Sequence, residues 1–571
     1  MTEHHSPISG VACSSDGYVA TAGYDNQIIL WRNRQPVARA FHDHLANQCC
    51  FSHDGKLLVT ASSDYTARLW SVPELRLLAV MGDHGDDVEM AAFSPDGKWI
   101  ATASRDHCVR VFDLNGRLQR SFTGHTADVI SVAWASDSRE LLSSSDDGTL
   151  RHWRFFEGDM RCLVDMGGVE TDTVAIGQDG TIFAGTDRGE IHVLAGANRQ
   201  IVAAHEAGIK RLTLSPDGSL LASASYDRTL RIWRRDDDGL VLLRHIAAPV
   251  EAWVRSIAFD SAGNLIVGTF GSSYAYYDLK EDRWDLDAVQ PTEGINSVLF
   301  HDGDTYTVGD AGLVRRNGEA LTAIGSLCNF LIAWKDRIVT GGHLGNLFDA
   351  RTGEILLRYR SPLNCAVALE GGELMIGTYT GDGLRVGQEP GTGRVELRQV
   401  ILLHDQAIKG IAANRKQVFS VSAAGDAAYH DLSSGDLVRR ISKAHRKIAN
   451  GACVLSNGDF ASISRDLRVR IWRGEQVREI ESPHDHSIKC VALSSNGRWL
   501  GTGSYNGHVS LYDLERDCWG PTYRPTFSGI SSLAAGACGD SLMAASYDGK
   551  VYLLHADAHE SFECLSSLAQ A

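Results

Sequence analysis

The sequence lacks several features that mark other classes of protein. It has no stretch of eighteen uninterrupted apolar residues, and its start includes Glu3, His4, His5 and Pro7, so we expect neither a membrane span nor a secretory signal. No CxxC pair occurs among its twelve cysteines, and no GxxxxGK[ST] motif is present to hold a phosphate. We therefore expect a soluble, cytoplasmic protein without a cofactor.

Positive charge is scarce as well. The chain has 55 Lys and Arg against 71 Asp and Glu, a formal net charge of -16. Residues 1–290 hold 27 basic against 40 acidic residues, and the remainder holds 28 against 31. General binding to phosphate backbones needs clustered Lys and Arg, so direct binding to nucleic acid is not expected. The two halves offer different surfaces, of which the first is the more acidic.

A unit of about forty residues recurs along the chain. One clear copy runs from Ser94–Gly97 to Val109–Phe112, and another runs from Ser215–Gly218 through Ala222–Asp227 to Leu230–Trp233. Each copy alternates apolar and polar residues and breaks at Asp-Gly or Asn-Gly, which is the signal of a β-hairpin. The pattern indicates a meander of short antiparallel strands.

These residues resemble the WD-repeat family, and the resemblance spans nearly the whole chain. The position that holds Trp in the family is occupied in turn by Trp31, Trp70, Phe112, Trp153, Leu194, Trp233, Tyr277, a place near Arg316, Phe348, Val386, His430, Trp472, Tyr512 and Leu554. Fourteen units imply an all-β fold of two tandem seven-bladed propellers, at 1–290 and 291–571, of which the second is more degenerate. A single unit cannot bury both of its faces alone, but neighbours stacked radially can.

The way the rings close is left open by the sequence. The last strand-like run, 561–565, could complete the blade of the first unit and so tie the two ends of the chain together. In that arrangement the first unit would join the C-terminal ring instead of the N-terminal one.

A recurring set of His, Ser, Asp and Trp is the most enzyme-like feature. It is seen as His42, Ser62, Asp64 and Trp70; His125, Ser145, Asp147 and Trp153; His205, Ser225, Asp227 and Trp233; and His445, Ser464, Asp466 and Trp472. The resemblance implies a structural network in which Asp orients His, His bonds Ser and Ser accepts the indole N–H. Catalysis needs one site with an exposed nucleophile, so four near-identical copies favour packing, and we predict no catalytic residue and no enzyme.

Two His-Asp-His tripeptides, at 42–44 and 484–486, raise the question of a metal. The first His of each is the one used by the blade network, and no further ligand lies nearby at a familiar spacing. We therefore expect no metal site.

A second set of side chains stands one position before the turn Asp, or at the corresponding place where that Asp is missing. It comprises Tyr24, Ser63, Arg105, Asp146, Tyr226, Phe270, Tyr379, Arg465, Tyr505 and Tyr547. In a propeller these turns gather around the mouth of the central channel, and Tyr and Arg often dominate the energy of interfaces. We predict that the aromatic and arginine members, all except Ser63 and Asp146, bind partner proteins, although Tyr-Asp is also a well-tolerated turn sequence.

The leading hypothesis is therefore a non-catalytic scaffold or adaptor that presents two propeller faces to proteins within a larger intracellular assembly. One basic cluster stands apart from the acidic background: Arg439, Arg440, Lys443, Arg446 and Lys447. It could receive an acidic, phosphorylated or nucleic-acid ligand through Arg contacts, although a solvated blade edge explains such a run as well. The third alternative is an enzyme that uses a channel as its active site.

Overall fold

A computed structural model describes residues 3–196, 198–236, 239–389, 391–556 and 562–565. Within these ranges the chain forms 56 β-strands, and no membrane-spanning helix is found among them. The strands combine into fourteen four-stranded antiparallel sheets. Every sheet is built from four strands that are consecutive in sequence, so each is one blade of the predicted repeat, and the predicted all-β propeller fold is confirmed.

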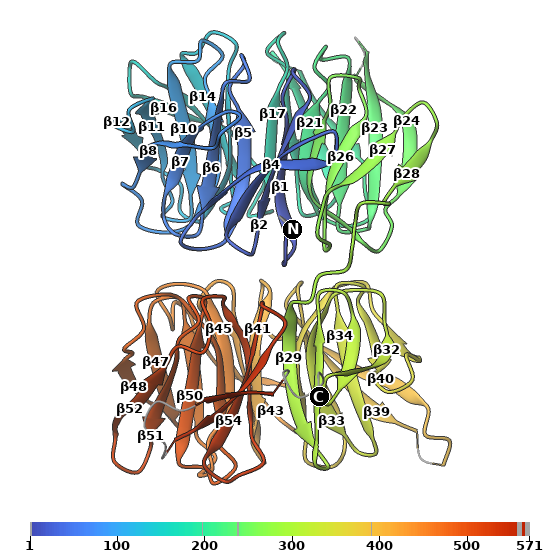
Figure 1. Cartoon of the computed structure of the whole chain (residues 1–571), viewed down its shortest axis with the longest axis vertical. Helices are drawn as coiled ribbons and strands as arrows, with labels where there is room; N and C mark the ends of the chain where they lie inside the picture. The colour runs from blue at the N-terminus through green and yellow to red at the C-terminus, as the bar shows by residue number, and fades with distance from the viewer. Residues whose placement is uncertain (1–2, 197, 237–238, 390, 557–561, 566–571) are drawn as a thin grey trace. The chain divides into compact units, whose positions relative to one another are not determined.

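The chain divides into two compact units, Met1–Thr292 and Glu293–Ala571, which hold seven blades each. In Figure 1 the first is coloured blue to green and the second yellow-green to red. The blades of the first unit are β1–β4 (Ile8–Cys13, Tyr18–Gly23, Gln27–Arg32, Gln35–Phe41), β5–β8 (Ala46–Phe51, Leu57–Ser62, Ala67–Ser71, Leu77–Met81), β9–β12 (Val88–Phe93, Trp99–Ser104, Val109–Asp113, Leu118–Phe122), β13–β16 (Val129–Trp134, Glu140–Ser145, Thr149–Arg154, Met160–Asp165), β17–β20 (Thr173–Ile176, Ile182–Gly185, Glu190–Ala195, Asn198–Ala203), β21–β24 (Ile209–Leu214, Leu220–Ser225, Thr229–Asp236, Gly239–Ala247) and β25–β28 (Ala252–Phe259, Leu265–Thr269, Ala275–Asp278, Arg283–Asp285).

The second unit has the same plan. Its blades are β29–β32 (Ile295–His301, Asp304–Gly309, Leu313–Arg316, Glu319–Ala323), β33–β36 (Cys328–Trp334, Arg337–Gly342, Asn346–Asp349, Ile355–Arg358), β37–β40 (Leu363–Ala368, Leu374–Thr378, Asp382–Gln388, Val395–Leu402), β41–β44 (Ile408–Ala413, Gln417–Ser422, Ala427–Asp431, Leu437–Ile441), β45–β48 (Ala449–Val454, Phe460–Ser464, Arg468–Arg473, Gln476–Glu481), β49–β52 (Ile488–Leu493, Trp499–Ser504, Val509–Asp513, Cys518–Tyr523) and β53–β56 (Ile530–Ala535, Ser541–Ser546, Val551–His555, Phe562–Cys564). We number the blades 1 to 14 in this order.

Each unit closes on itself as a ring. The first strand of each blade lies beside the first strand of the next, from β1 through β25 and back to β1 in the first unit, and from β29 through β53 and back to β29 in the second. Apolar side chains fill the closing interfaces, as between Trp31 and Tyr274 in the first propeller and between Val298 and Met543 in the second. Stacking of neighbours therefore buries both faces of every blade.

Hydrogen bonds cross the same two closing interfaces. The backbone N–H of Val11 donates to the Ser256 hydroxyl at 2.8 Å, and the Ser531 hydroxyl donates to the Ile295 carbonyl. Strand β1 thus belongs to the N-terminal ring, and β56 pairs with β55 of its own blade. The alternative closure, with the first unit in the C-terminal ring and 561–565 in the first blade, is not found; Ser561 itself lies outside the described residues.

Candidate interaction site

One backbone hydrogen bond recurs in all fourteen blades and defines a common position. The N–H of a residue one or two positions after the second strand donates to a carbonyl shortly before the first strand of the same blade, as from Tyr226 to Gly208 at 3.0 Å and from Tyr505 to Ser487 at 3.2 Å. The bond holds the turn between the second and third strands against the connection that enters the blade. We call this donor the rim position and this end of the propeller the rim face.

The rim positions hold all ten residues that the sequence analysis selected, along with four that it did not. In chain order they are Tyr24, Ser63, Arg105, Asp146, Asp187, Tyr226 and Phe270 in the first propeller and Asp310, His343, Tyr379, Ala423, Arg465, Tyr505 and Tyr547 in the second. Asp187, Asp310, His343 and Ala423 were missed because none of them is followed by Asp and none is Tyr or Phe.

A spacing in the sequence could have found the four missed residues. The rim residue stands seven positions before the family's Trp position, as Tyr226 does before Trp233. In blades 8 and 9 the same spacing leads to Asn317 and Ala350, whereas Arg316 and Phe348 had been expected. Neither Asn nor Ala resembles the aromatic residue at this place, so the register of these two blades could not be read from side-chain type.

A β-bulge near the start of the first strand places a second side chain next to the rim position. The register shifts there in thirteen of the fourteen blades. A bulge re-aims the side chain of its extra residue. Where this residue is Asn it holds the neighbouring blade, as Asn329 Nδ2 does by donating to the Leu363 carbonyl at 2.9 Å. The remaining bulge positions include Glu89, Lys210, Lys409 and Lys489, so charge gathers at the rim face.

Carboxylates accompany the cations on the rim face of the first propeller. Arg105 donates to Glu89 and, at 2.6 Å, to Asp128. Lys210 donates to Asp172 and, at 2.8 Å, to Asp187.

Acidic residues nevertheless outnumber the cations there. Burial raises the pKa of Asp146 far above its usual value, and the neighbouring charges of Glu170, Asp172 and Asp128 raise it further. Burial, with Asp187 and Asp172, raises the pKa of Glu170 to about 8. These carboxyl groups crowd one another in the folded protein.

The predicted aromatic residues of the first propeller contact cations or the ring of Trp253. Tyr24 packs edge-on against Trp253 with ring centroids 5.1 Å apart, and Trp253 stacks on Phe270 at 5.4 Å. The Lys210 ammonium lies 4.8 Å from the centroid of the Tyr226 ring. Tyr24 and Tyr226 are half-buried, whereas Phe270 is 5% exposed and offers a partner little surface.

The rim face of the second propeller has cations over aromatic rings. Tyr505 stacks on Tyr547 with centroids 6.4 Å apart, and the charged groups of Lys489 and Arg465 lie 5.8 Å and 6.0 Å from the centroid of the Tyr505 ring. In the same way, Lys409 lies 5.5 Å from the centroid of the Tyr379 ring. The first propeller has the same kind of contact, between Lys210 and Tyr226.

The predicted basic patch does not form a single cluster. Arg439 and Arg440 lie in β44 and reach different places: Arg439 donates to the Gly474 carbonyl of the next blade at 3.3 Å, and Arg440 donates at 2.8 Å to Asp405, in the connection that enters its own blade. Lys443, Arg446 and Lys447 belong to the connection between β44 and β45 at the rim face. Adjacent residues of a strand point to opposite sides of the sheet, so the run in sequence is divided in space.

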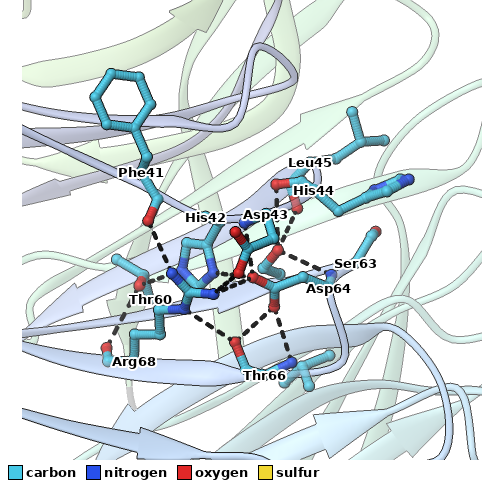
Figure 2. A network of polar contacts seen from close by, with 12 residues as sticks. Phe41, His42, Asp43, His44, Leu45, Thr60, Ser63, Asp64, Thr66 and Arg68 are labelled. Atoms are coloured by element: carbon cyan, nitrogen blue, oxygen red, sulfur yellow. Dashed lines mark hydrogen bonds and ion pairs between the residues drawn. The ribbon is translucent and has the colours of Figure 1, made fainter. Parts of the chain in front are cut away.

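The predicted network of His, Asp and Trp is present, with a different hydroxyl. In blade 2, His42 Nδ1 donates to Asp64 at 2.8 Å, and its Nε2 accepts from the Thr60 hydroxyl at 2.7 Å. The Trp70 indole N–H donates to the same hydroxyl at 2.8 Å. Figure 2 shows the His42 ring between Thr60 and Asp64. The predicted member, Ser62, is not part of this chain of hydrogen bonds.

The same correction applies to all four blades. Ser143, Ser223 and Ser462 take the place predicted for Ser145, Ser225 and Ser464. Leu58 is paired directly with Trp70, so Thr60 is the diagonal neighbour that the indole reaches on the same face. Ser62 lies at the end of the strand, where it accepts the Asp64 N–H at 3.0 Å and donates to the Leu45 carbonyl at 2.8 Å. It therefore fastens the turn to the rim face.

A fifth complete network, which the sequence analysis missed, lies in blade 1. His4 contacts Asp25 at 3.0 Å and Thr21 at 2.7 Å, and Trp31 donates to Thr21 at 2.8 Å. The spacings of the three side chains are those of blade 12, so the same pattern could have been found in the sequence. The shared hydroxyls in all five blades are fully buried, an arrangement suited to packing.

The His-Asp-His tripeptides do not converge on a common point. His42 takes part in the network, whereas His44 points away from it in Figure 2. In the second tripeptide, His484 bonds Thr502 at 2.9 Å. Among the described residues, no group of three or more His, Cys, Asp or Glu side chains is placed to hold a metal ion.

Comparison with known proteins identifies the repeat. The family described as "WD domain, G-beta repeat" matches at residues 1–32, 35–71, 75–113, 116–154, 196–234 and 474–513. Five of the six matches fall in the first propeller and one in the second. The unmatched blades are largely those of the second half whose signature side chains are missing.

Similar proteins share part of the chain. The target of rapamycin complex subunit wat1 of Schizosaccharomyces pombe is 29% identical over 248 residues, which is 40% of this chain and 77% of that protein. A guanine nucleotide-binding protein subunit beta of Oryza sativa subsp. indica is 28% identical over 39% of this chain and 63% of its own. An uncharacterised WD repeat-containing protein of Synechocystis is 32% identical over 38% of this chain and 65% of its own. The last two are thus matched over less than two thirds of their length. With its recurring blades, its buried networks and these matches, the chain belongs to the WD-repeat family of β-propeller proteins.

Proposed function

We propose that the chain is a non-catalytic scaffold that presents the rim faces of two propellers to protein partners, as a subunit or regulator of a larger cytoplasmic assembly. The observation that carries the proposal is the recurring rim position, which gathers Tyr24, Arg105, Tyr226, Phe270, Tyr379, Arg465, Tyr505 and Tyr547 at two faces. Tyr and Arg combine apolar area with directed polar groups and are frequent hot spots of interfaces.

Two further observations support this proposal. The names of two relatives describe subunits of assemblies, a target of rapamycin complex and a guanine nucleotide-binding protein. The networks of His, Asp and a hydroxyl, which resemble hydrolytic triads, support a packing role, because their hydroxyls are buried and accept indole N–H groups. A triad requires instead a nucleophile that a substrate can reach.

The test is capture of partners by the intact chain from a lysate, compared between the parent protein and single variants. Tyr226→Ala changes a half-buried rim residue, and Phe156→Ala is the matched control because Phe156 is 53% exposed and lies in the turn between β15 and β16, at the opposite end of its blade. We expect capture that survives high salt, that is lost with Tyr226→Ala and that is kept with Phe156→Ala.

The same experiment separates the scaffold from a reader of charged ligands. Attraction between exposed charges weakens as salt rises. Capture that falls steeply with salt and disappears with Arg446→Glu would contradict the proposal and favour the charged-ligand alternative. Capture that is unchanged in every rim variant of both propellers would also contradict it.

A further inference from the structure

Phe527 is the most exposed of the large hydrophobic side chains in the described residues, at 82%. It lies in the connection between β52 and β53, on the rim face of blade 14. In blades 2, 4, 6 and 13 the residue at the corresponding place, immediately after the network His, is Asp43, Thr126, Glu206 or Asp485. An aromatic ring therefore stands in water where those four blades place a polar side chain.

The loop that carries Phe527 is anchored on both sides of the ring. The Thr526 hydroxyl donates to Asp548 at 2.6 Å and accepts the Ser528 N–H at 3.0 Å. The Arg524 guanidinium lies 4.4 Å from the centroid of the Phe527 ring. A ring that is held in place before binding loses little freedom when a partner covers it, and this lowers the cost of association.

Phe527 is continuous with the cationic and aromatic part of the rim. Gly529, two residues later, lies so close to blade 13 that an added Cβ would be 3.1 Å from the Tyr547 ring and 3.0 Å from the Tyr505 carbonyl. Lys489 and Arg465 stand over the Tyr505 ring. We call Arg465, Lys489, Tyr505, Arg524, Phe527 and Tyr547 the Phe527 surface.

Charged side chains of both signs lie at the two rim faces. In the first propeller, Arg105 and Lys210 lie against carboxylates of their own chain. In the second propeller, the seven rim positions include one carboxylate, that of Asp310, which is 2% exposed. The cations beside Phe527 share this part of the rim with carboxylates, such as that of Asp548, which accepts the Thr526 hydroxyl at 2.6 Å.

We propose that the Phe527 surface binds an acidic segment of a partner protein, whose carboxylates pair with Arg465, Lys489 and Arg524 and whose apolar side chain packs on Phe527. The inference rests on the proposed scaffold function and names the chemistry of one of its partners. Carboxylates match guanidinium and ammonium groups, and an aromatic anchor surrounded by polar contacts is the usual anatomy of a hot spot.

The probe that tests this is a display library of short random peptides, panned against the intact chain. We expect enrichment of peptides in which Asp and Glu flank an aromatic or branched aliphatic residue. An enriched peptide is then labelled and titrated by fluorescence anisotropy. We expect Phe527→Ala to weaken its binding at least about tenfold, in the range of a hot-spot residue, and Phe156→Ala to leave it unchanged.

The charged part of the surface has its own variant. Arg465→Glu combined with Lys489→Glu should abolish binding at low salt, and replacement by Gln at both positions should weaken it less. Because Phe527 is 82% exposed, its variant should melt at the temperature of the parent, so a loss of affinity cannot be assigned to unfolding.

Several results would overturn the inference. Panning that enriches nothing, or that enriches basic or wholly polar peptides, contradicts it, and so does a Phe527→Ala variant that binds like the parent. If the parent self-associates in sedimentation and Phe527→Ala makes it monomeric, the surface belongs to a second copy of the chain. In each case, capture of lysate proteins that still depends on Tyr226 would leave the scaffold proposal standing.

Discussion

Trp70 and His42 meet at one hydroxyl, that of Thr60, which accepts the indole N–H at 2.8 Å and donates to the imidazole at 2.7 Å. All three side chains are buried. The hydroxyl therefore joins the third strand of blade 2 to the connection that enters the blade. Buried polar groups stabilise a fold only when every partner is present, so the cost of removing one depends on what the others lose.

The first prediction concerns this coupling. Thr60→Val leaves two buried polar groups without their partner and should lower the free energy of unfolding by about 1–3 kcal/mol. Trp70→Phe removes one of those groups, so the double variant should cost less than the sum of the single ones. Denaturant unfolding of the four proteins measures the difference. Ser62→Ala serves as control: combined with Trp70→Phe it should be additive, and coupling there instead would restore Ser62 to the network.

The second prediction concerns the crowded carboxyl groups of the first propeller. The pKa of Asp146 is raised by burial and by its acidic neighbours, so the folded chain keeps a proton that the unfolded chain has already lost. Stability from this group is complete below the usual carboxyl pKa and is lost as pH rises through the raised one. Asp146→Asn should therefore raise the melting temperature at pH 8, more than at pH 4. An equal effect at both pH values would contradict this assignment.

The third prediction concerns the acidic side of the pH range. Burial and the charge of Arg440 lower the pKa of His404 from 6.5 to about 4. Between these values the unfolded chain binds a proton that the folded chain does not, so stability is complete above pH 6.5 and falls as pH approaches 4, by up to about 3 kcal/mol. The dependence of unfolding on pH between 7 and 4 should be shallower in His404→Gln. A slope identical to that of the parent would refute the role of His404.

The fourth prediction compares ring closure with an ordinary blade interface. The Ser256 hydroxyl accepts the Val11 N–H across the closing interface, and the Thr173 hydroxyl accepts the Leu212 N–H at 3.0 Å between blades 5 and 6. Both hydroxyls are fully buried. Ser256→Ala and Thr173→Val should each lower stability by about 1–3 kcal/mol. A much larger loss with Ser256→Ala, seen in the same denaturation experiment, would mean that closure is the weak point of the ring.

The fold could be predicted well from the sequence because the same pattern of residues recurs in most of the fourteen units. Hairpin signals and the residues at the family's Trp position located all fourteen blades, although blades 8 and 9 lack a recognisable side chain there. The closure of the rings was harder to predict, because the packing of β1 against β25 depends on contacts between residues far apart in the sequence, such as Val11 and Ser256. Strand alternation alone could not tell Thr60 from Ser62, because both lie on the same face.

The candidate site was predicted in part. Position relative to the turn sufficed to find Tyr226 and Tyr505 at the rim, because the turn geometry is the same in every blade. The cations over their rings come from bulges, and a bulge such as that at Lys489 leaves no mark in the residue types around it. Phe527 escaped notice because a lone aromatic residue in a loop is uninformative until its exposure is known.

Each blade consists of four consecutive strands, and each ring is closed by the same kinds of contact that join its other blades. In neither ring does the closing interface differ in kind from the interfaces between the other blades. New chain ends could therefore be opened at other connections between blades while the old ends are linked, and a circular permutant of one ring should retain its set of rim side chains. Evolution could rotate the starting point of such a ring, or lengthen the chain by whole blades, without interrupting a sheet.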